Sequence, residues 1–334
     1  MVTPQQVLRM PGPADFVRFA PDFGKRFILT IDTEEEFDWS KPLDRTSHGL
    51  DHVPRLAKFQ QFCEALGVVP IYLVDYPVAS DPRAAEVLAD AVAAGRAEIG
   101  VQLHPWVNPP YDEDITVHNS FAGNLPPDLE RAKFRKLRDT IEQAFGIGPA
   151  IYRAGRYGVG PNTADILSDC GIAIDTSVRA NFDYSSTGGP DFHLHPLQPW
   201  WICKRNGLME VPLTTVFTGI LKRFGKHVYP LLWRVPRMRG LLARLGLLER
   251  ISLTPEGITL EEALRGIDVA VDLDLPLLVL SFHSPSLCPG YTPYVRNDDD
   301  LDRFYDWWRG VFARLEAHGV KPACVREIIE AAEV

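Results

Sequence analysis

Residues 29–36 read Leu29-Thr30-Ile31-Asp32-Thr33-Glu34-Glu35-Glu36, an apolar strand that runs directly into a group of carboxylates. Repulsion among neighbouring carboxylates is costly unless a cation or a shared proton relieves it. Asp32 and Glu34 are two residues apart, so their side chains point to one side of an extended chain. We therefore expect a metal-binding or catalytic role for both. Glu35 and Glu36 are expected to lie in a solvated acidic loop.

Short apolar runs recur along the chain and alternate with longer helix-like segments, which is the pattern of repeated β-α units. Strands are predicted at 26–32, 68–74, 98–103, 150–154, 172–175, 209–213 and 277–283. Helices are predicted at 53–66, 83–94, 127–144, 162–170, 298–317 and 325–332. The fold class is therefore α/β, a distorted (β/α) barrel with about seven parallel strands. It spans residues 26–334 after an N-terminal extension at 1–25.

The bulk composition narrows the class of protein. With 46% hydrophobic and 24% charged residues, the chain resembles soluble globular proteins, which excludes a disordered chain. A formal net charge of -9 without a basic run argues against nucleic-acid binding, which relies on clustered Lys and Arg. The five cysteines are scattered and form no C-x-x-C pair, so we expect reduced thiols.

The chain shows no sign of export or of a membrane span. Residues 1–25 contain no apolar stretch long enough for a signal peptide. No run of about 18 apolar residues, the length that a spanning helix needs, occurs anywhere in the sequence. We therefore expect a cytoplasmic protein.

Polar side chains stand at the ends of the predicted strands. In parallel α/β barrels the site lies at the carboxyl ends of the strands, because the loops that follow them converge there. The residues that end or directly follow strands are Asp32, His104, Arg153, Asp175 and His283. We expect these five to meet at one rim of the barrel.

The two histidines of this group offer different chemistry. Gln102 and His104 share one side of their strand, and a neutral imidazole there could bind zinc or a similar divalent ion. A hydrogen bond from His104 to a loop carbonyl is the alternative. His283 leaves a fully apolar strand and can donate a proton to a leaving group.

Positive charge and aromatic rings are expected beside these groups. Arg153 and Arg156 bring fixed charge that can hold a carboxylate in its ionised form. Trp39, Trp106 and Tyr157 could stack on a sugar face, although aromatic residues at strand ends are as often simple packing. The candidate substrate-binding residues are Trp39, Trp106, Arg156 and Tyr157.

In this order, the motifs resemble the polysaccharide-deacetylase superfamily, also called the NodB-homology or carbohydrate esterase family 4 group. The resemblance covers roughly residues 26–325. It rests on Thr30-Ile31-Asp32, Glu98-Ile99-Gly100 before His104-Pro105, the arginine turn at 153–158, the segment 171–177 and a last strand ending in His283. It implies a distorted barrel with fewer than eight strands, and hydrolysis of an acetamide on an amino sugar with a divalent metal.

The resemblance also implies roles for single residues. Asp32 matches the general base, and His283 matches the acid that protonates the departing amine. Arg153 is similar to the arginine that pairs with the base, and Asp175 to the acidic residue that supports the histidine. His104 matches the second histidine of the metal motif.

The metal motif departs from the family pattern at two places. The family has paired aspartates where this chain has Asp32-Thr33, so Glu34 would supply the metal carboxylate or Asp32 would bind directly. Gln102 stands nearest to the first histidine of the family, and an amide is a poorer zinc ligand than an imidazole. The candidate ligands of a divalent metal, zinc first, are Asp32, Glu34, Gln102 and His104. Weakened affinity, a carboxylate-rich site and no metal remain open.

One basic segment interrupts the alternation of strands and helices. Residues 217–251 read as helical, with basic residues between leucines, and indicate a helical insertion at about 217–253. It could cap the barrel with its charges in water. It could instead make a peripheral contact with an anionic membrane or hold an acidic ligand. After it, Thr254-Pro255-Glu256 predicts the start of a helix.

The function expected first is a hydrolase of non-peptide carbon–nitrogen bonds, acting by metal-assisted deacetylation of an N-acetylated sugar or sugar conjugate. A metal-independent cyclic-amide hydrolase similar to allantoinase is the second interpretation. A non-catalytic carbohydrate-binding relative is the third. The expected partner is a carbohydrate or other small-molecule substrate, without nucleic acid.

Overall fold

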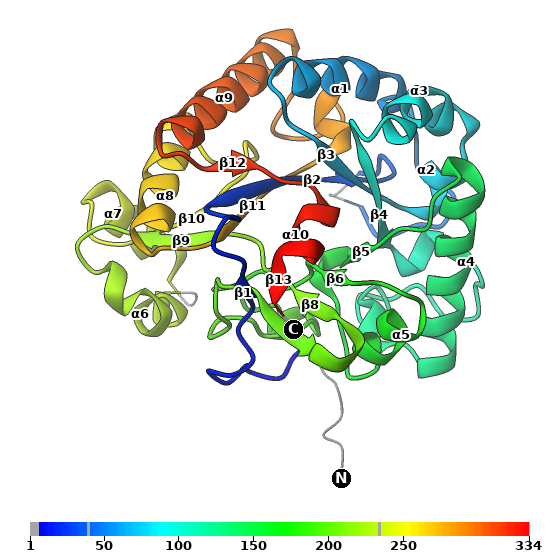
Figure 1. Ribbon diagram of the computed structural model, residues 1–334, viewed down its shortest axis with the longest axis horizontal. Helices are drawn as coiled ribbons and strands as arrows, with labels where there is room; N and C mark the ends of the chain where they lie inside the picture. The colour runs from blue at the N-terminus through cyan, green and yellow to red at the C-terminus, as the bar shows by residue number, and fades with distance from the viewer. Residues whose placement is uncertain (1–6, 39–40, 233–234, 334) are drawn as a thin grey trace.

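A curled sheet forms the centre of the molecule, and helices cover its outside (Figure 1). The computed structural model describes residues 7–38, 41–232 and 235–333. Seven strands are parallel neighbours in the order β11-β2-β3-β4-β5-β6-β8. They are β2 (Arg26–Thr33), β3 (Pro70–Val74), β4 (Glu98–Leu103), β5 (Ile151–Ala154), β6 (Ile174–Asp175), β8 (Leu208–Glu210) and β11 (Leu277–His283). Each overlaps a predicted strand, so the α/β class with a distorted barrel is confirmed.

Shorter strands extend this sheet or lie beside it. β7 (Trp200–Cys203) pairs antiparallel with β8, and β12 (Lys321–Pro322) pairs parallel with β2. β1 (Arg18–Phe19) pairs antiparallel with β13 (Ala332–Glu333). Part of the predicted N-terminal extension is therefore tied to the other end of the chain.

Helices cover the sheet with one apolar face each. In α4 (Pro127–Phe145), Phe134, Leu137 and Ile141 recur every three or four residues and are buried. This helix ends at Gly146, whose φ of 71° is strained for any residue with a side chain. The other outer helices are α1 (Leu56–Ala65), α2 (Tyr76–Ser80), α3 (Pro82–Ala93), α5 (Thr163–Asp169), α8 (Leu260–Asp272) and α9 (Asp298–Ala317). By contrast, α10 (Val325–Ala331) packs Val325 and Ile328 against the inner apolar cluster.

The alternation of side chains along β2 brings an acid to the inner rim. Ile28 belongs to the apolar cluster inside the barrel, whereas Leu29 and Ile31 pack in the cluster beneath the helices. Successive side chains of a strand point to opposite faces, so Asp32 shares the inward face with Ile28.

The predicted helical insertion is helical only in its middle. Its ends are β9 (Thr215–Thr218) and β10 (Glu249–Ser252), which pair antiparallel, with α6 (Gly225–Leu231) and α7 (Pro236–Arg244) between them. The prediction of helix was wrong at both ends because β-branched residues there form a ladder. The β9–β10 pair is joined to the barrel, because Ser281 of β11 donates its backbone N–H to the carbonyl of Leu253, the residue after β10 (3.1 Å).

The helix predicted to start at Thr254-Pro255-Glu256 begins later, at Leu260. Thr259 caps it, and the Thr259 and Glu262 side chains bond each other's backbone N–H groups in a capping box. This leaves Glu256 in the preceding loop. Within the described residues, no helix is both long and apolar enough to cross a bilayer.

Candidate active site

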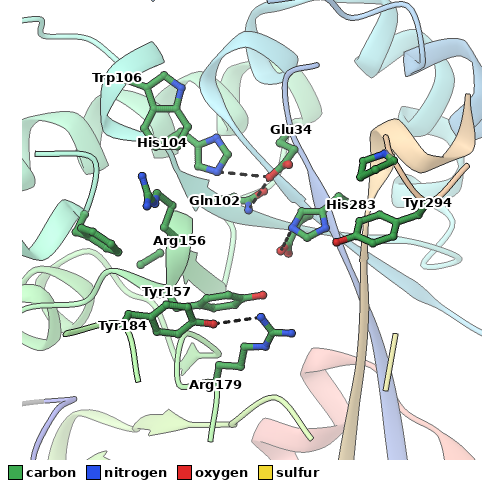
Figure 2. A pocket seen from close by; sticks show the side chains of 14 residues that line it. Glu34, Gln102, His104, Trp106, Arg156, Tyr157, Arg179, Tyr184, His283 and Tyr294 are labelled. Carbon is green, nitrogen blue, oxygen red and sulfur yellow. Dashed lines mark hydrogen bonds and ion pairs between the residues drawn. The ribbon is translucent and has the colours of Figure 1, made fainter. Parts of the chain in front are cut away.

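A cavity of about 380 Å³ opens at the carboxyl ends of the parallel strands. Figure 2 shows side chains from β2, β4 and β11 converging on it. The predicted residues that line it are Asp32, Glu34, Gln102, His104, Trp106, Arg156, Tyr157 and His283. Its size is within the range of small-molecule pockets. Most of the predicted site residues therefore do meet at one end of the barrel.

Asp32 is held by Arg153, as expected from the sequence. The guanidinium of Arg153 is fully buried and forms an ion pair with Asp32 Oδ1. Its other donors reach Thr30 Oγ1 (2.8 Å) and the carbonyl of Thr176 (3.0 Å). The other oxygen, Asp32 Oδ2, lies 3.7 Å from His283 Nε2. One carboxylate oxygen is therefore fixed, and the other faces the histidine.

The carboxylate that supports His283 is Glu256. The prediction that Asp175 supports this histidine was therefore wrong. His283 Nδ1 donates to Glu256 Oε2 (2.6 Å), and the His283 backbone N–H donates to Oε1 (3.1 Å). Ser286 Oγ also donates to Oε1 (2.7 Å). Three donors thus fix Glu256, which approaches from the loop before α8 rather than from β6.

The charge of Glu256 changes the protonation of His283. Burial by itself would lower the pKa of His283, but the carboxylates of Glu256, Glu34 and Asp32 raise it to about 10. Burial opposes ionisation of Glu256 as well, and its contacts with His283 still bring its pKa below the ordinary value. The contact with Glu256 therefore favours the imidazolium form of His283.

Asp175 lies behind the cavity and has another partner. Its Oδ1 accepts hydrogen bonds from the backbone N–H (3.0 Å) and the hydroxyl of Ser177. Burial raises the pKa of Asp175 to about 6 and that of the neighbouring Glu210 well above its usual value. The charge of Asp175 opposes the ionisation of its buried neighbour Glu210, and the charge of Arg153 acts on both carboxyl groups in the other direction.

Glu34, Gln102 and His104 meet beside His283, with Glu34 close enough for its charge to act on the imidazole (Figure 2). Gln102 Nε2 donates to Glu34 Oε2 (3.2 Å), and His104 Nε2 lies 3.5 Å from the same oxygen. Burial raises the pKa of Glu34 to about 8. Within the described part of the chain, the buried Gln102 Oε1 has no hydrogen-bond partner.

The prediction that Glu35 and Glu36 form a solvated loop was wrong, because both are buried. His104 Nδ1 donates to Glu35 Oε2 (2.8 Å), and Trp106 Nε1 donates to Oε1 (2.9 Å). His52 Nδ1 donates to Glu36 Oε1 (2.7 Å). Each carboxylate thus meets a donor from a distant segment, which a single acidic run does not reveal.

Two groups of residues could hold a cation. Glu35, Asp75 and His104 place ligand atoms within 4.8 Å of one another, as the described residues show. However, Asp75 already accepts hydrogen bonds from Val78 and Glu35, and Glu35 orients the ring of His104. We interpret this group as support for His104, because metal-binding imidazoles commonly donate their second nitrogen to a carboxylate.

The group that faces the cavity has the better chemistry for a metal. The support of Glu35 at Nδ1 leaves Nε2 of a neutral His104 pointing at Glu34. A half-turn of the Gln102 amide would present its unpartnered Oε1 to the same space. Asp32, predicted as a ligand, is engaged by Arg153. The donor set of Glu34, Gln102 and His104 therefore fits a divalent cation.

The arginine turn after β5 has an unusual backbone. Arg156 and Tyr157 both have positive φ, 55° and 62°. Gly155 precedes them, and a Cβ there would come within 2.2 Å of the His104 ring. This close approach explains the glycine and sets Tyr157 at the cavity wall.

Aromatic and basic side chains also line the cavity, and only some of them were predicted from the sequence. Trp39 lies outside the described residues, whereas Trp106 stacks on His104 with ring centroids 4.4 Å apart. The lining residues missed from sequence include Arg179, Tyr184 and Tyr294. They come from loops without strand-end motifs, so the sequence offered no signal for them.

No family model and no curated protein matches the chain. Among solved structures, a candidate polysaccharide deacetylase from Mycobacterium smegmatis is 20% identical, with a TM-score of 0.54 over 96% of this chain and 93% of that one. A carbohydrate esterase family 4 pseudoenzyme from Bacillus anthracis is 11% identical, with a TM-score of 0.46 over 93% and 67%. The first likeness shows that this chain has the polysaccharide-deacetylase fold.

Proposed function

We propose that this protein hydrolyses a carbon–nitrogen bond, removing the acetyl group from an N-acetylated sugar or sugar conjugate. The observation that supports this most is the meeting of two polar dyads at one cavity. Asp32 with Arg153 and His283 with Glu256 lie side by side, 3.7 Å apart at Asp32 Oδ2 and His283 Nε2. A base and an acid that both reach one bond in the same cavity are what amide hydrolysis requires.

The two dyads divide the proton transfers between them. Asp32 would take a proton from the attacking water, whose oxygen forms the new bond to the acetyl carbon. The imidazolium of His283 would give its Nε2 proton to the amine as the carbon–nitrogen bond breaks. Acetate and a free amine result, and Glu256 keeps His283 charged until the transfer.

A divalent cation is proposed on Glu34, His104 and Gln102. When bound, it supplies polarisation of the acetyl carbonyl and a lower pKa for a coordinated water. The buried Glu34 and the orphaned Gln102 Oε1 support this assignment, because a cation would satisfy both. Oxygen-rich ligands suit magnesium- or manganese-like ions as well as zinc, so the identity of the metal is left to measurement.

Aromatic walls are proposed to hold the sugar. Trp106, Tyr157, Tyr184 and Tyr294 line the cavity, and Tyr157 and Tyr184 stack with centroids 5.6 Å apart. Sugar faces pack well on such rings.

The proposal is tested by measuring acetate release from a panel of N-acetylated mono- and oligosaccharides. Turnover should be lost in Asp32→Asn and His283→Ala, and it should persist in Asp44→Asn, which changes an exposed acid. Circular dichroism would verify that each variant is folded. Turnover unchanged in both site variants would contradict the proposal.

Metal stripping separates the alternatives on the same scaffold. Loss of turnover after chelation, with recovery on adding Zn²⁺ or Mn²⁺, is expected. Turnover of cyclic amides that survives chelation would favour the allantoinase-like interpretation. Sugar binding without any turnover, with or without metal, would favour a non-catalytic relative.

A further inference from the structure

The cavity contains more positive charge than its own carboxylates balance. Asp32 pairs with Arg153, and Glu256 pairs with His283. Arg156 and Arg179 also line the cavity. Across the described ranges 7–38, 41–232 and 235–333, neither of these two has a carboxylate oxygen within 4.0 Å of its nitrogens. Neither guanidinium group is therefore in direct contact with a carboxylate of the described residues, although the charge of Glu256 acts on Arg179 from a greater distance.

Arg179 is held in place by neutral groups. Its guanidinium donates to Tyr184 Oη (3.1 Å) and to Ser252 Oγ (3.5 Å), and it lies 3.9 Å from the ring centroid of Phe182. Its Nε is buried and has no hydrogen-bond partner among the described residues. The side chain is thus pre-ordered, with donor capacity to spare.

Arg156 is fixed in a similar way on another part of the wall. It donates to Ser120 Oγ (2.8 Å), and its guanidinium lies 4.6 Å from the ring centroid of Phe121. Its half-buried position on a left-handed turn keeps it at the cavity. Neither arginine serves a proton transfer in the proposed reaction.

We infer that the substrate carries a negatively charged group, a carboxylate or a phosphate, which binds Arg179 while Arg156 adds a second positive contact. A half-buried cation without a partner is costly, and an anionic ligand removes that cost. Guanidinium groups bind both anions through paired N–H donors. The acetamide part of this substrate rests on the proposed function, whereas the anion site does not.

Binding to the full chain carrying His283→Ala, which blocks turnover and keeps Asp32 as the partner of Arg153, tests the inference by calorimetry. The probes are N-acetylglucosamine, its 1-phosphate, its 6-phosphate and N-acetylmuramic acid, so phosphate and carboxylate are compared with a neutral sugar. At least one anionic probe should bind about tenfold tighter or more. Adding Arg179→Gln should remove that preference and keep the affinity for N-acetylglucosamine.

Arg237→Gln, an exposed arginine of α7, is the matched control and should keep the preference. Equal affinity for all four probes in the unaltered arginine background would overturn the inference, whether or not Arg179→Gln folds. A preference that survives Arg179→Gln in folded protein would also overturn it. Deacetylation of neutral sugars without anion preference would leave the proposed function standing alone. Anion preference without deacetylation of any probe would support the anion site and contradict the proposed function.

Discussion

The cavity and the insertion at 217–251 differ in which side chains are buried. The cavity buries charged side chains, whereas the insertion exposes apolar ones. At the cavity, Arg153 is fully buried and paired, and Asp32 is 3% exposed. On the insertion, Ile220 is 80% and Leu231 73% exposed. Buried charges need partners, and the chain supplies most of them itself. Among the described residues, little covers these apolar side chains, and a group of exposed apolar side chains is typical of a surface that contacts another molecule.

The exposed surface of the insertion is both apolar and basic. Residues 217–251 contain eight basic residues and one acidic residue, in a chain whose net charge is -9. Its exposed large apolar side chains are Ile220, Phe224, Leu231, Val235, Met238, Leu241 and Leu245. Figure 1 shows α6 and α7 at the outside of the molecule, beyond β9 and β10. Of the alternatives that the sequence left open for this segment, we propose peripheral contact with an anionic membrane, because its exposed apolar and basic side chains suit that contact.

The largest expected effect is on the free energy of unfolding, when an arginine is removed from the cavity and, for comparison, from the insertion. Arg153→Ala removes the buried guanidinium that pairs with Asp32 Oδ1, leaves His283 Nε2 at 3.7 Å as the remaining ion-pair partner, and should lower the free energy of unfolding by about 3–5 kcal/mol. Arg237→Ala, on the exposed insertion, should change it by less than about 0.5 kcal/mol. Urea unfolding of both variants measures the difference. Similar values for the two would remove the contrast between the regions.

The support of His283 sharpens the description of the cavity. Glu256→Gln should lower kcat by about 100-fold, because the acid loses its positioning and its charge partner. The pKa of His283, raised to about 10 mainly by Glu256, should fall, so the alkaline limb of the pH–rate profile should move to lower pH. Glu261→Gln, at an exposed acid of α8, is the control. An unmoved alkaline limb would argue against His283 as the acid.

The insertion is tested with vesicles. The full chain should co-sediment with vesicles rich in phosphatidylglycerol and not with pure phosphatidylcholine. Leu231→Ser combined with Leu245→Ser should weaken this binding about tenfold, because apolar burial is lost. Equal binding to both vesicle types, or concentration-dependent dimerisation without vesicle binding, would contradict the proposal.

The smallest effect is expected in the absence of vesicles. Leu231→Ser should leave the free energy of unfolding within about 0.5 kcal/mol of the unaltered chain, because its side chain is already in water. Leu280→Ala, in the core of β11, should lower it by about 2–5 kcal/mol. A large loss in Leu231→Ser would mean that the insertion supports the fold.

Much of the site was predictable from the ends of the strands. Asp32, His104, Arg153 and His283 each follow an apolar run, and the rim of a parallel barrel collects such residues. Asp175 also ends a strand, yet it faces Ser177 and Glu210 instead of His283. The position of Asp175 at a strand end predicted that it lies near the site, but not which way its side chain points.

The amino-acid sequence by itself determined the seven parallel strands and the acid and histidines at their ends, because periodicity and strand boundaries are local properties. Only the tertiary structure decided that Glu256 holds His283, that Glu35 orients His104 and that Arg179 donates to Tyr184 and Ser252 at the cavity. Partners and burial depend on which distant segments meet, and desolvation then sets the protonation of each group.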